Sequence, residues 1–412
     1  MKFAWALFIV LFNFQAVAGG LGAPYSLGST AVLPKGIRSL SVGGIMSTVD
    51  TWYNDVSITS GVAEPFSLSL SYGRLLKAES DVNLKLNVES QLKAKGVSLD
   101  QIAGNSFADV NTRVVATVPV MAYGVSEKWT LAVAVPVVYF NMDVETGFVG
   151  TDQLQNLVTT FSKASRKQTQ LIESKLRDVI QTEIANKGYK PLQDMERTML
   201  GDVTLVAKYL AAKELNYSWS LTNRFVLPTA QVKDVAKVID PVAGDGQFDY
   251  GIDSTVEVPI NARWKMIQQT SYTIQFADTR ETRVPVSESE RLSTVVDYGA
   301  RRDLGDMVSG AFGAQYQPHP SFSVAGSYTI GYKERDQWRG NQASVDRYNV
   351  LGFQTEQFMQ AFFLQGAVSS IHAFQAKRFP IPFTASLGVG KVTDGRNIRN
   401  NPVWSFNMAM YF

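Results

Sequence analysis

The sequence has 412 residues, of which 45% are hydrophobic and 18% charged. Its 39 basic and 37 acidic side chains leave a net charge of +2, too balanced for a protein whose main partner is nucleic acid. The chain contains no cysteine, which excludes disulfides, thiolate metal ligands and cysteine nucleophiles.

Residues 1–18 have the pattern of a cleavable secretory signal peptide. Lys2 precedes the apolar run FAWALFIVLFNF, and the small residues of an A-x-A site end at Ala18. This pattern predicts cleavage after about Ala18 and export across an inner membrane. No later stretch has the roughly 18 consecutive apolar residues of a spanning helix, so the sequence predicts no second helical span. We expect 19–412 to form a single domain.

From residue 107 to the end of the chain, apolar and polar side chains alternate with the period of two that is typical of β-strands. The run Ser321–Lys333, SFSVAGSYTIGYK, alternates throughout, and Trp129–Tyr139, Tyr217–Leu227 and Phe248–Val258 repeat the pattern. Each run matches the roughly 9–11 residues of a tilted membrane-crossing strand, with aromatic side chains near its ends. The sequence therefore predicts an all-β protein, a transmembrane antiparallel barrel, in preference to a soluble β-sandwich.

Short turns alternate with long connections, as in outer-membrane barrels, and an even number of strands puts both chain ends on one side. We expect twelve strands, with a fourteen-strand alternative that adds Phe66–Tyr72 and Asn83–Val88. The expected strands are 36–48, 107–122, 128–141, 201–211, 216–228, 247–259, 263–277, 305–317, 320–334, 355–368, 379–391 and 402–412.

Two long excursions, 49–106 and 143–200, interrupt the predicted barrel. In the second, apolar residues recur with helical spacing from Leu154 to Ile184, and Gly188 is a plausible end for that helix. Two interpretations stay open for this helix: an amphipathic segment resting on neighbouring loops, or a lid over the mouth of the lumen.

The last ten residues, VWSFNMAMYF, form an apolar stripe that includes Trp404, Phe406 and the terminal Phe412. The stripe resembles the C-terminal signature by which bacterial outer-membrane barrels are recognised for assembly. It implies the barrel-assembly machinery and outer-membrane lipid as partners.

Catalytic chemistry finds little support in the sequence. Its two histidines, His319 and His372, fall in predicted turns, and no nucleophile elbow, metal-spaced histidine pair or phosphate-binding loop is present. Asp249, Asp253 and Glu257 share one strand face, but neighbours in this series are about 13 Å apart, too far for a catalytic dyad. We expect no enzyme activity, metal or cofactor.

Charged and amide side chains on the predicted inner face are better candidates for function. Such side chains can tune the selectivity of a channel, or they can pair with one another and fill a narrow barrel, and both interpretations stay open. The candidate lumen-lining residues are Arg113, Lys208, Arg224, Asp249, Asp253, Glu257, Lys265, Gln269, Gln275 and Lys333.

Several short motifs carry a family resemblance: YGVSEKWTLAVAVPVVY at 123–139, GDVTLVAKYL at 201–210, Leu227-Pro228-Thr229, and GDGQFDYG at 244–251. Together they resemble the outer-membrane barrels associated with aromatic (meta-pathway phenol) degradation, relatives of the fatty-acid and hydrocarbon channels. The resemblance covers about 107–412.

The resemblance implies a channel or facilitator for small, hydrophobic or aromatic molecules. The Asn-Pro-Ala motif of the hatch in fatty-acid channels is not found between 19 and 60. The alternative is a structural or surface-interaction outer-membrane protein that uses its long loops, and an outer-membrane enzyme is a remote third class.

Overall fold

The computed structural model describes residues 28–412 except 62–67, 79–81, 155, 157–180, 182–183, 192 and 289–291. The predicted signal peptide at 1–18 and most of the predicted helix between Leu154 and Ile184 lie outside the described residues. The end of that helix is described, and Gly188 terminates it with a positive φ of 75°, while Tyr189 N donates to Ile184 O at 3.1 Å.

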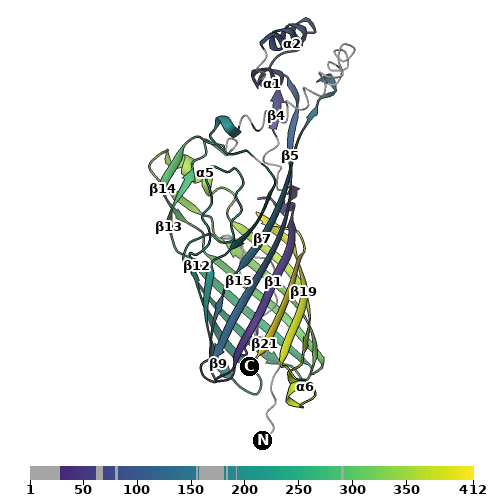
Figure 1. The fold of residues 1–412 in the computed structure, drawn as a ribbon, viewed down its shortest axis with the longest axis vertical. Coiled ribbons are helices and arrows are strands. Elements are labelled where there is room, and N and C mark those ends of the chain that lie inside the picture. Colours follow the sequence, from purple (N-terminus) through teal and green to yellow (C-terminus); the bar gives the residue numbers. More distant parts are fainter. Residues whose placement is uncertain are drawn as a thin grey trace.

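The protein is a closed antiparallel β-barrel of twelve strands, as the alternating pattern predicts (Figure 1). The first strand, β1, pairs with both the last strand and β5, which closes the wall. The wall strands are β1 (Arg38–Val49), β5 (Ile102–Gly124), β6 (Trp129–Ala134) continued by β7 (Val137–Gly150), β8 (Met195–Leu200) continued by β9 (Val203–Lys213), β10 (Ser218–Leu227), β11 (Asp249–Pro259), β12 (Trp264–Gln275), β15 (Met307–His319), β16 (Phe322–Lys333), β18 (Gln357–Ser369), β19 (Phe383–Arg396) and β21 (Val403–Tyr411).

The strand predicted at 128–141 is broken into β6 and β7, and the strand predicted at 201–211 is preceded, across a neighbouring break, by β8, which lies in the predicted excursion 143–200. Pro136 has no N–H to donate, and it separates β6 from β7. Gly201 lies between β8 and β9, where its N–H donates to Pro136 O at 2.8 Å. A Cβ on Gly201 would lie 2.9 Å from both Pro136 Cβ and Ala243 O, so this crossing requires glycine.

The fourteen-strand alternative is wrong. Part of Phe66–Tyr72 forms β4 (Leu68–Ser71), but this strand pairs with the start of β5, above the barrel wall. The other candidate, Asn83–Val88, lies within helix α2 (Val82–Ala94). Helix α2 packs against α1 (Tyr72–Ala78), where Leu92 and Tyr72 are buried together. In this segment the helical spacing of apolar residues therefore prevails over the local alternation.

The excursions are shorter than predicted because the wall strands extend beyond the barrel. β5 has 23 residues and is about 76 Å long, roughly twice the length of a membrane crossing. Its first half, with β7, β4, α1 and α2, forms an arm that rises above the barrel (Figure 1). We call this the loop end. The opposite end, with the short turns, α6 (Ile371–Gln375) and the C-terminus, is the turn end.

Two small sheets also lie at the loop end. One contains β13 (Asp278–Arg283), β14 (Val296–Asp303) and β17 (Gln337–Arg339), and it packs with helix α5 (Val345–Leu351) beside the barrel mouth. The other contains β2 (Thr51–Tyr53), β3 (Thr59–Gly61) and β20 (Ile398–Arg399).

The outer face of the wall is mostly apolar, with aromatic side chains at the turn end. The ring centroids of Trp129 and Tyr209 are 4.7 Å apart, and so are those of Trp264 and Tyr316. This arrangement is typical of a membrane-spanning barrel. Among the described residues, no helix is long and apolar enough to cross a membrane.

Candidate channel lumen

Nine of the ten candidate lumen residues point to the inside of the barrel. Glu257 and Lys265 are half-buried and the other seven are buried. The buried residues are Lys208, Arg224, Asp249, Asp253, Gln269, Gln275 and Lys333.

Arg113 is the exception, because it lies on the outer face of β5 between the buried Thr112 and Val114. Its Nη2 is 3.6 Å from Met46 Sδ. Tyr123 lies at the turn end of β5, and Arg113 is ten residues away from it along the strand. This separation places Arg113 near the loop-end edge of an apolar band about 25 Å tall. A cation at that height reaches water on the outside, so its charge does not require an inward position.

The inner charges form close pairs across neighbouring strands. Arg224 on β10 contacts Asp253 on β11 at 2.9 Å, and Ser271 Oγ donates to the same carboxylate at 2.5 Å. Lys265 on β12 contacts Glu257 at 3.2 Å. These contacts agree with the interpretation in which the lumen charges pair with one another. A role of these charges in channel selectivity is a separate proposal.

A segment of the chain that the sequence left unassigned, 28–34, occupies the turn end of the lumen. Its backbone N–H groups donate to side chains of the inner wall. Gly28 N donates to Gln269 Oε1 at 2.8 Å, Thr30 N to Glu257 Oε1 at 3.1 Å and Leu33 N to Thr130 Oγ1 at 2.7 Å. Lys208 Nζ donates to Ser29 O. These bonds account for several of the predicted inner residues, which bind residues 28–34. We name residues 28–34 the N-terminal segment.

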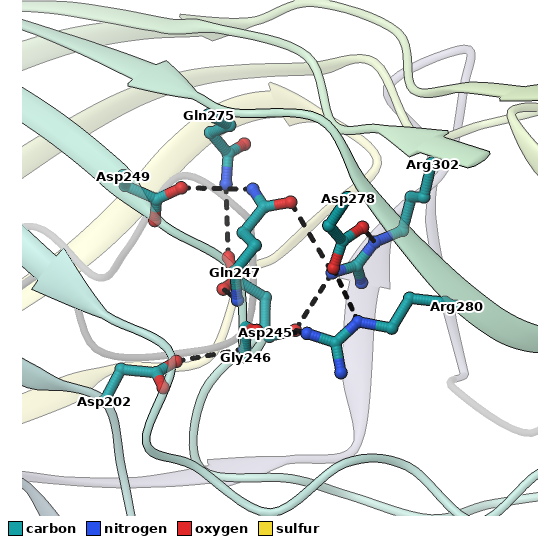
Figure 2. A network of polar contacts seen from close by, with 9 residues as sticks. All are labelled: Asp202, Asp245, Gly246, Gln247, Asp249, Gln275, Asp278, Arg280 and Arg302. Carbon is teal, nitrogen blue, oxygen red and sulfur yellow. Dashed lines mark hydrogen bonds and ion pairs between the residues drawn. The ribbon is translucent and has the colours of Figure 1, made fainter.

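A second polar network lies at the loop end of the barrel, and Figure 2 shows its residues. Asp278 on β13 accepts hydrogen bonds from Arg280 at 2.5 Å and from Arg302 on β14 at 2.9 Å. Arg302 also donates to Asp245 O at 3.0 Å. The arginines therefore tie the small sheet of β13 and β14 to the loop that enters β11.

Asp202 organises the same loop from below. Its Oδ1 accepts the backbone N–H groups of Thr229 and Ala230, both at 2.8 Å, and its Oδ2 accepts Gly246 N at 3.1 Å. A Cβ on Gly244 would lie 1.9 Å from Asp202 Oδ2, so the turn requires glycine. Three motifs that carried the family resemblance thus meet at one carboxylate.

The network also contains buried groups of the barrel rim. Gln275 donates to Asp245 Oδ2 at 3.2 Å, and Gln247 donates to Asp249 Oδ1 at 3.1 Å. Burial raises the pKa of Asp245 above its ordinary value, and nearby Asp202 adds to this increase. Sequence reasoning missed Asp278, Arg280 and Arg302, because they lie in a loop whose fold follows from contacts distant in the chain.

One side of the inner wall is apolar. Buried side chains follow the inner face of β5 at every second position, and Ile45, Val138 and Met199 continue this surface on neighbouring strands near the mouth. The members on β5 are Val114, Ala116, Val118, Val120 and Ala122. We call this surface the apolar wall. The polar side chains of β9–β12 lie on other strands of the same barrel.

The described residues include no group of three or more His, Asp or Glu side chains that could hold a metal ion. His319 lies at the end of β15 and His372 in α6, both at the turn end and both exposed. The described side chains inside the barrel make hydrogen bonds, ion pairs and apolar contacts.

No protein-family model matches the sequence, and no curated protein matches it. Among solved structures, the COG4313 outer membrane channel from Pseudomonas putida F1 aligns over 94% of this chain and 100% of its own, with a TM-score of 0.53 and 12% identity. A Pseudomonas aeruginosa FadL homologue covers 97% and 99% with a TM-score of 0.35 and 8% identity. The P. putida toluene transporter TodX covers 92% and 90% with a TM-score of 0.36 and 8% identity. The first similarity shows that the chain has the fold of an outer-membrane channel barrel.

Proposed function

We propose that this protein is an outer-membrane channel that lets small hydrophobic or aromatic molecules pass. Its closed wall with an apolar outer band suits a bilayer, and the signal-peptide pattern at 1–18 suits export to the outer membrane. Outer-membrane lipid is then the surrounding solvent of the barrel.

The apolar wall is the observation that carries the proposed cargo. A lumen that passes ions and sugars is lined by polar groups, whereas the inner face of β5 is apolar from Val114 to Ala122. These side chains are packed near Ala243 towards the loop end and against Leu33 at the turn end, so a cargo reaches them when those contacts open. A small hydrophobic molecule gains free energy from contact with such a surface, because less of its area is exposed to water. The family resemblance of residues 123–139 agrees with this cargo.

At each end of the lumen, hydrogen bonds and ion pairs fix a segment of the chain in place. Passage requires that the N-terminal segment shifts at the turn end and that the Asp278–Arg302 network opens at the loop end. Each hydrogen bond contributes about 1 kcal/mol, so thermal motion can break a few of them together.

The proposal is tested by transport into proteoliposomes. We expect wild-type protein to accelerate the entry of a radiolabelled monoaromatic hydrocarbon and the double variant Val114→Thr/Val138→Thr to slow it several-fold, because two hydroxyl groups then interrupt the apolar wall. Val115→Thr is the matched control, since Val115 is the neighbouring residue on the outer face of β5.

Heat-modifiable migration on a gel checks that each variant is folded. If the folded wild-type protein passes neither the hydrocarbon nor a small sugar, the channel proposal fails. If it passes the sugar and the hydrocarbon equally, and Val114→Thr/Val138→Thr changes neither, the proposed cargo fails.

A further inference from the structure

Three adjacent strands carry polar side chains on the outer, lipid-facing side of the barrel. They are Asn223 on β10, Ser254 on β11, and Gln268 and Thr270 on β12. The register aligns Leu221 with Ser254 and Ser254 with Thr270, so these side chains form one continuous patch. We call it the polar patch.

The polar patch lies at the middle depth of the membrane band. Trp219 and Trp264 mark the turn-end rim of β10 and β12, and Asn223 and Gln268 are each four residues further along. Four residues span about 13 Å of strand, or about 10 Å of height at a tilt near 40°. The apolar band is about 25 Å tall, so both amides fall well inside it.

The outer face at this depth is apolar on five other strands, β9, β15, β18, β19 and β21. Bulky apolar side chains there are exposed: Leu205, Phe312, Phe362, Leu364, Leu387 and Met408. Polar atoms in hydrocarbon are unfavourable unless they find hydrogen-bond partners, and those in membrane proteins usually face protein. The polar patch therefore needs a protein surface opposite it.

The hydrogen bonds of the polar patch leave complementary groups. Tyr250 OH donates to Asn223 Oδ1 at 2.6 Å, which leaves the Asn223 amide N–H groups as donors. Gln268 Nε2 donates to Thr270 Oγ1 at 2.7 Å, and among the described residues nothing donates to Gln268 Oε1. The patch thus has a donor on β10 and an acceptor on β12 at the same depth.

We infer that the polar patch is the interface of a homodimer in the membrane. Two copies inserted in the same direction are related by a two-fold axis along the membrane normal. Such an axis at β11 places β10 of one copy against β12 of its partner. Asn223 Nδ2 then donates to Oε1 of the partner's Gln268, and the same bond forms in reverse. Ser254, which is small, lies at the axis and lets the two walls approach.

The chain contains no cysteine, so a single introduced cysteine reports on this geometry. We expect Ser254→Cys in outer-membrane vesicles to give a band of twice the monomer mass with a short bifunctional maleimide. Ile252→Cys, next on the same face of β11, serves as a second reporter that keeps the Trp219–Ser254 hydrogen bond. Met408→Cys is the control, because β21 lies six strands from β11 in either direction around the wall.

Adding Asn223→Leu or Gln268→Leu to the reporter should reduce cross-linking several-fold while heat-modifiable migration shows a folded barrel. Phe312→Leu, on the adjacent strand β15, should leave it unchanged. Equal cross-linking of Met408→Cys, no cross-linking of either β11 reporter, or no effect of the leucine substitutions would overturn the dimer.

The inference rests on the membrane location in the proposed function and not on transport. Absence of the protein from the membrane fraction would contradict the proposed location. A barrel that is found in the membrane and conducts as a monomer would contradict only the dimer.

Discussion

The guanidinium of Arg224 is enclosed between the inner faces of β10, β11 and β12. It contacts the Asp253 carboxylate at 2.9 Å and Ser271 Oγ at 3.1 Å, and its side chain is 8% exposed. A charge in so dry a place depends on its partner, because removal of one member leaves the other buried without compensation. We expect paired lumen charges of this kind to contribute to the stability of the barrel, whether or not they also influence permeation.

We expect Arg224→Met to lower the free energy of unfolding by about 3–5 kcal/mol, and Arg224→Met/Asp253→Leu to recover most of that loss. The exposed pair Lys190–Asp234 is the matched control, and Lys190→Met should change stability by less than about 1 kcal/mol. Urea unfolding in lipid vesicles, followed by tryptophan fluorescence, measures all of these variants. A single variant as stable as wild type would mean that water solvates Asp253.

At the scale of elements, the sheet of β13, β14 and β17 with α5 forms a small cluster of its own above the mouth. Tyr348 on α5 is buried against Val284 and Ala300, and its hydroxyl donates to Asp297 on β14. Gly299 N also donates to Asp297 at 2.9 Å. Burial alone would raise the pKa of Asp297, but these hydrogen bonds outweigh it and hold the pKa below its ordinary value.

A lowered pKa in the folded state means that Asp297 stabilises this cluster above the pKa of the unfolded chain, about 3.9. The contribution is lost as the pH falls below that value and through the folded-state pKa. We expect faster amide exchange in α5 at about pH 3 than at pH 6, after correction for intrinsic rates, and no such difference in Asp297→Asn. Peptides from β12 provide the internal reference, and exchange that is equal at both pH values in wild type would contradict the role of Asp297.

The N-terminal segment is the other element whose contacts can be tested. Replacing two of its acceptors in Gln269→Ala/Thr130→Val removes about 2 kcal/mol of hydrogen bonding, which corresponds to a roughly 30-fold shift towards the open state. Single-channel recording in planar bilayers should show a higher open probability. Thr117→Val, the same kind of change on the outer face of β5, should leave conductance unchanged. An unchanged open probability in the double variant would show that the segment does not control the pore.

At the scale of the whole molecule, closure depends on the two ends of the chain. Arg38 N donates to Phe412 O at 2.8 Å and Phe412 N to Arg38 O at 3.0 Å, so the last residue joins the first wall strand. The side chains of Trp404, Phe406 and Phe412 point outwards, and that of Phe412 is 64% exposed. An exposed ring adds little to the folded barrel, but it is available to a partner during assembly.

We expect Phe412→Ala to reduce the folded fraction in the outer membrane several-fold without changing the urea midpoint of the barrel that does assemble. Phe322→Ala is the matched control, because Phe322 is 42% exposed and begins β16 at the same end. The ratio of heat-modifiable to unfolded bands measures assembly. Equal ratios for the two variants would contradict an assembly role for Phe412.

Strand positions could be predicted because alternation is a local property. A wall strand such as β16 has lipid on one face and protein or water on the other, so its sequence reports its own structure. The same reasoning placed Lys208 and Lys333 inside, where a charge alternates with apolar outer neighbours. It failed for Arg113, because both faces of β5 are apolar within the membrane and alternation there gives no direction.

A transmembrane antiparallel barrel, with twelve strands as the first of two alternatives, follows from the sequence alone, because period two is imposed by the pleat of each strand. The position of the N-terminal segment, the convergence of three loops on Asp202 and the Asp278–Arg302 network were decided by the tertiary structure. These contacts join residues from 24 to 241 positions apart, and they form only when closure of the wall brings the strands around one lumen. The polar patch belongs to both levels, since its residues are visible in the sequence but become neighbours only in the register of the sheet.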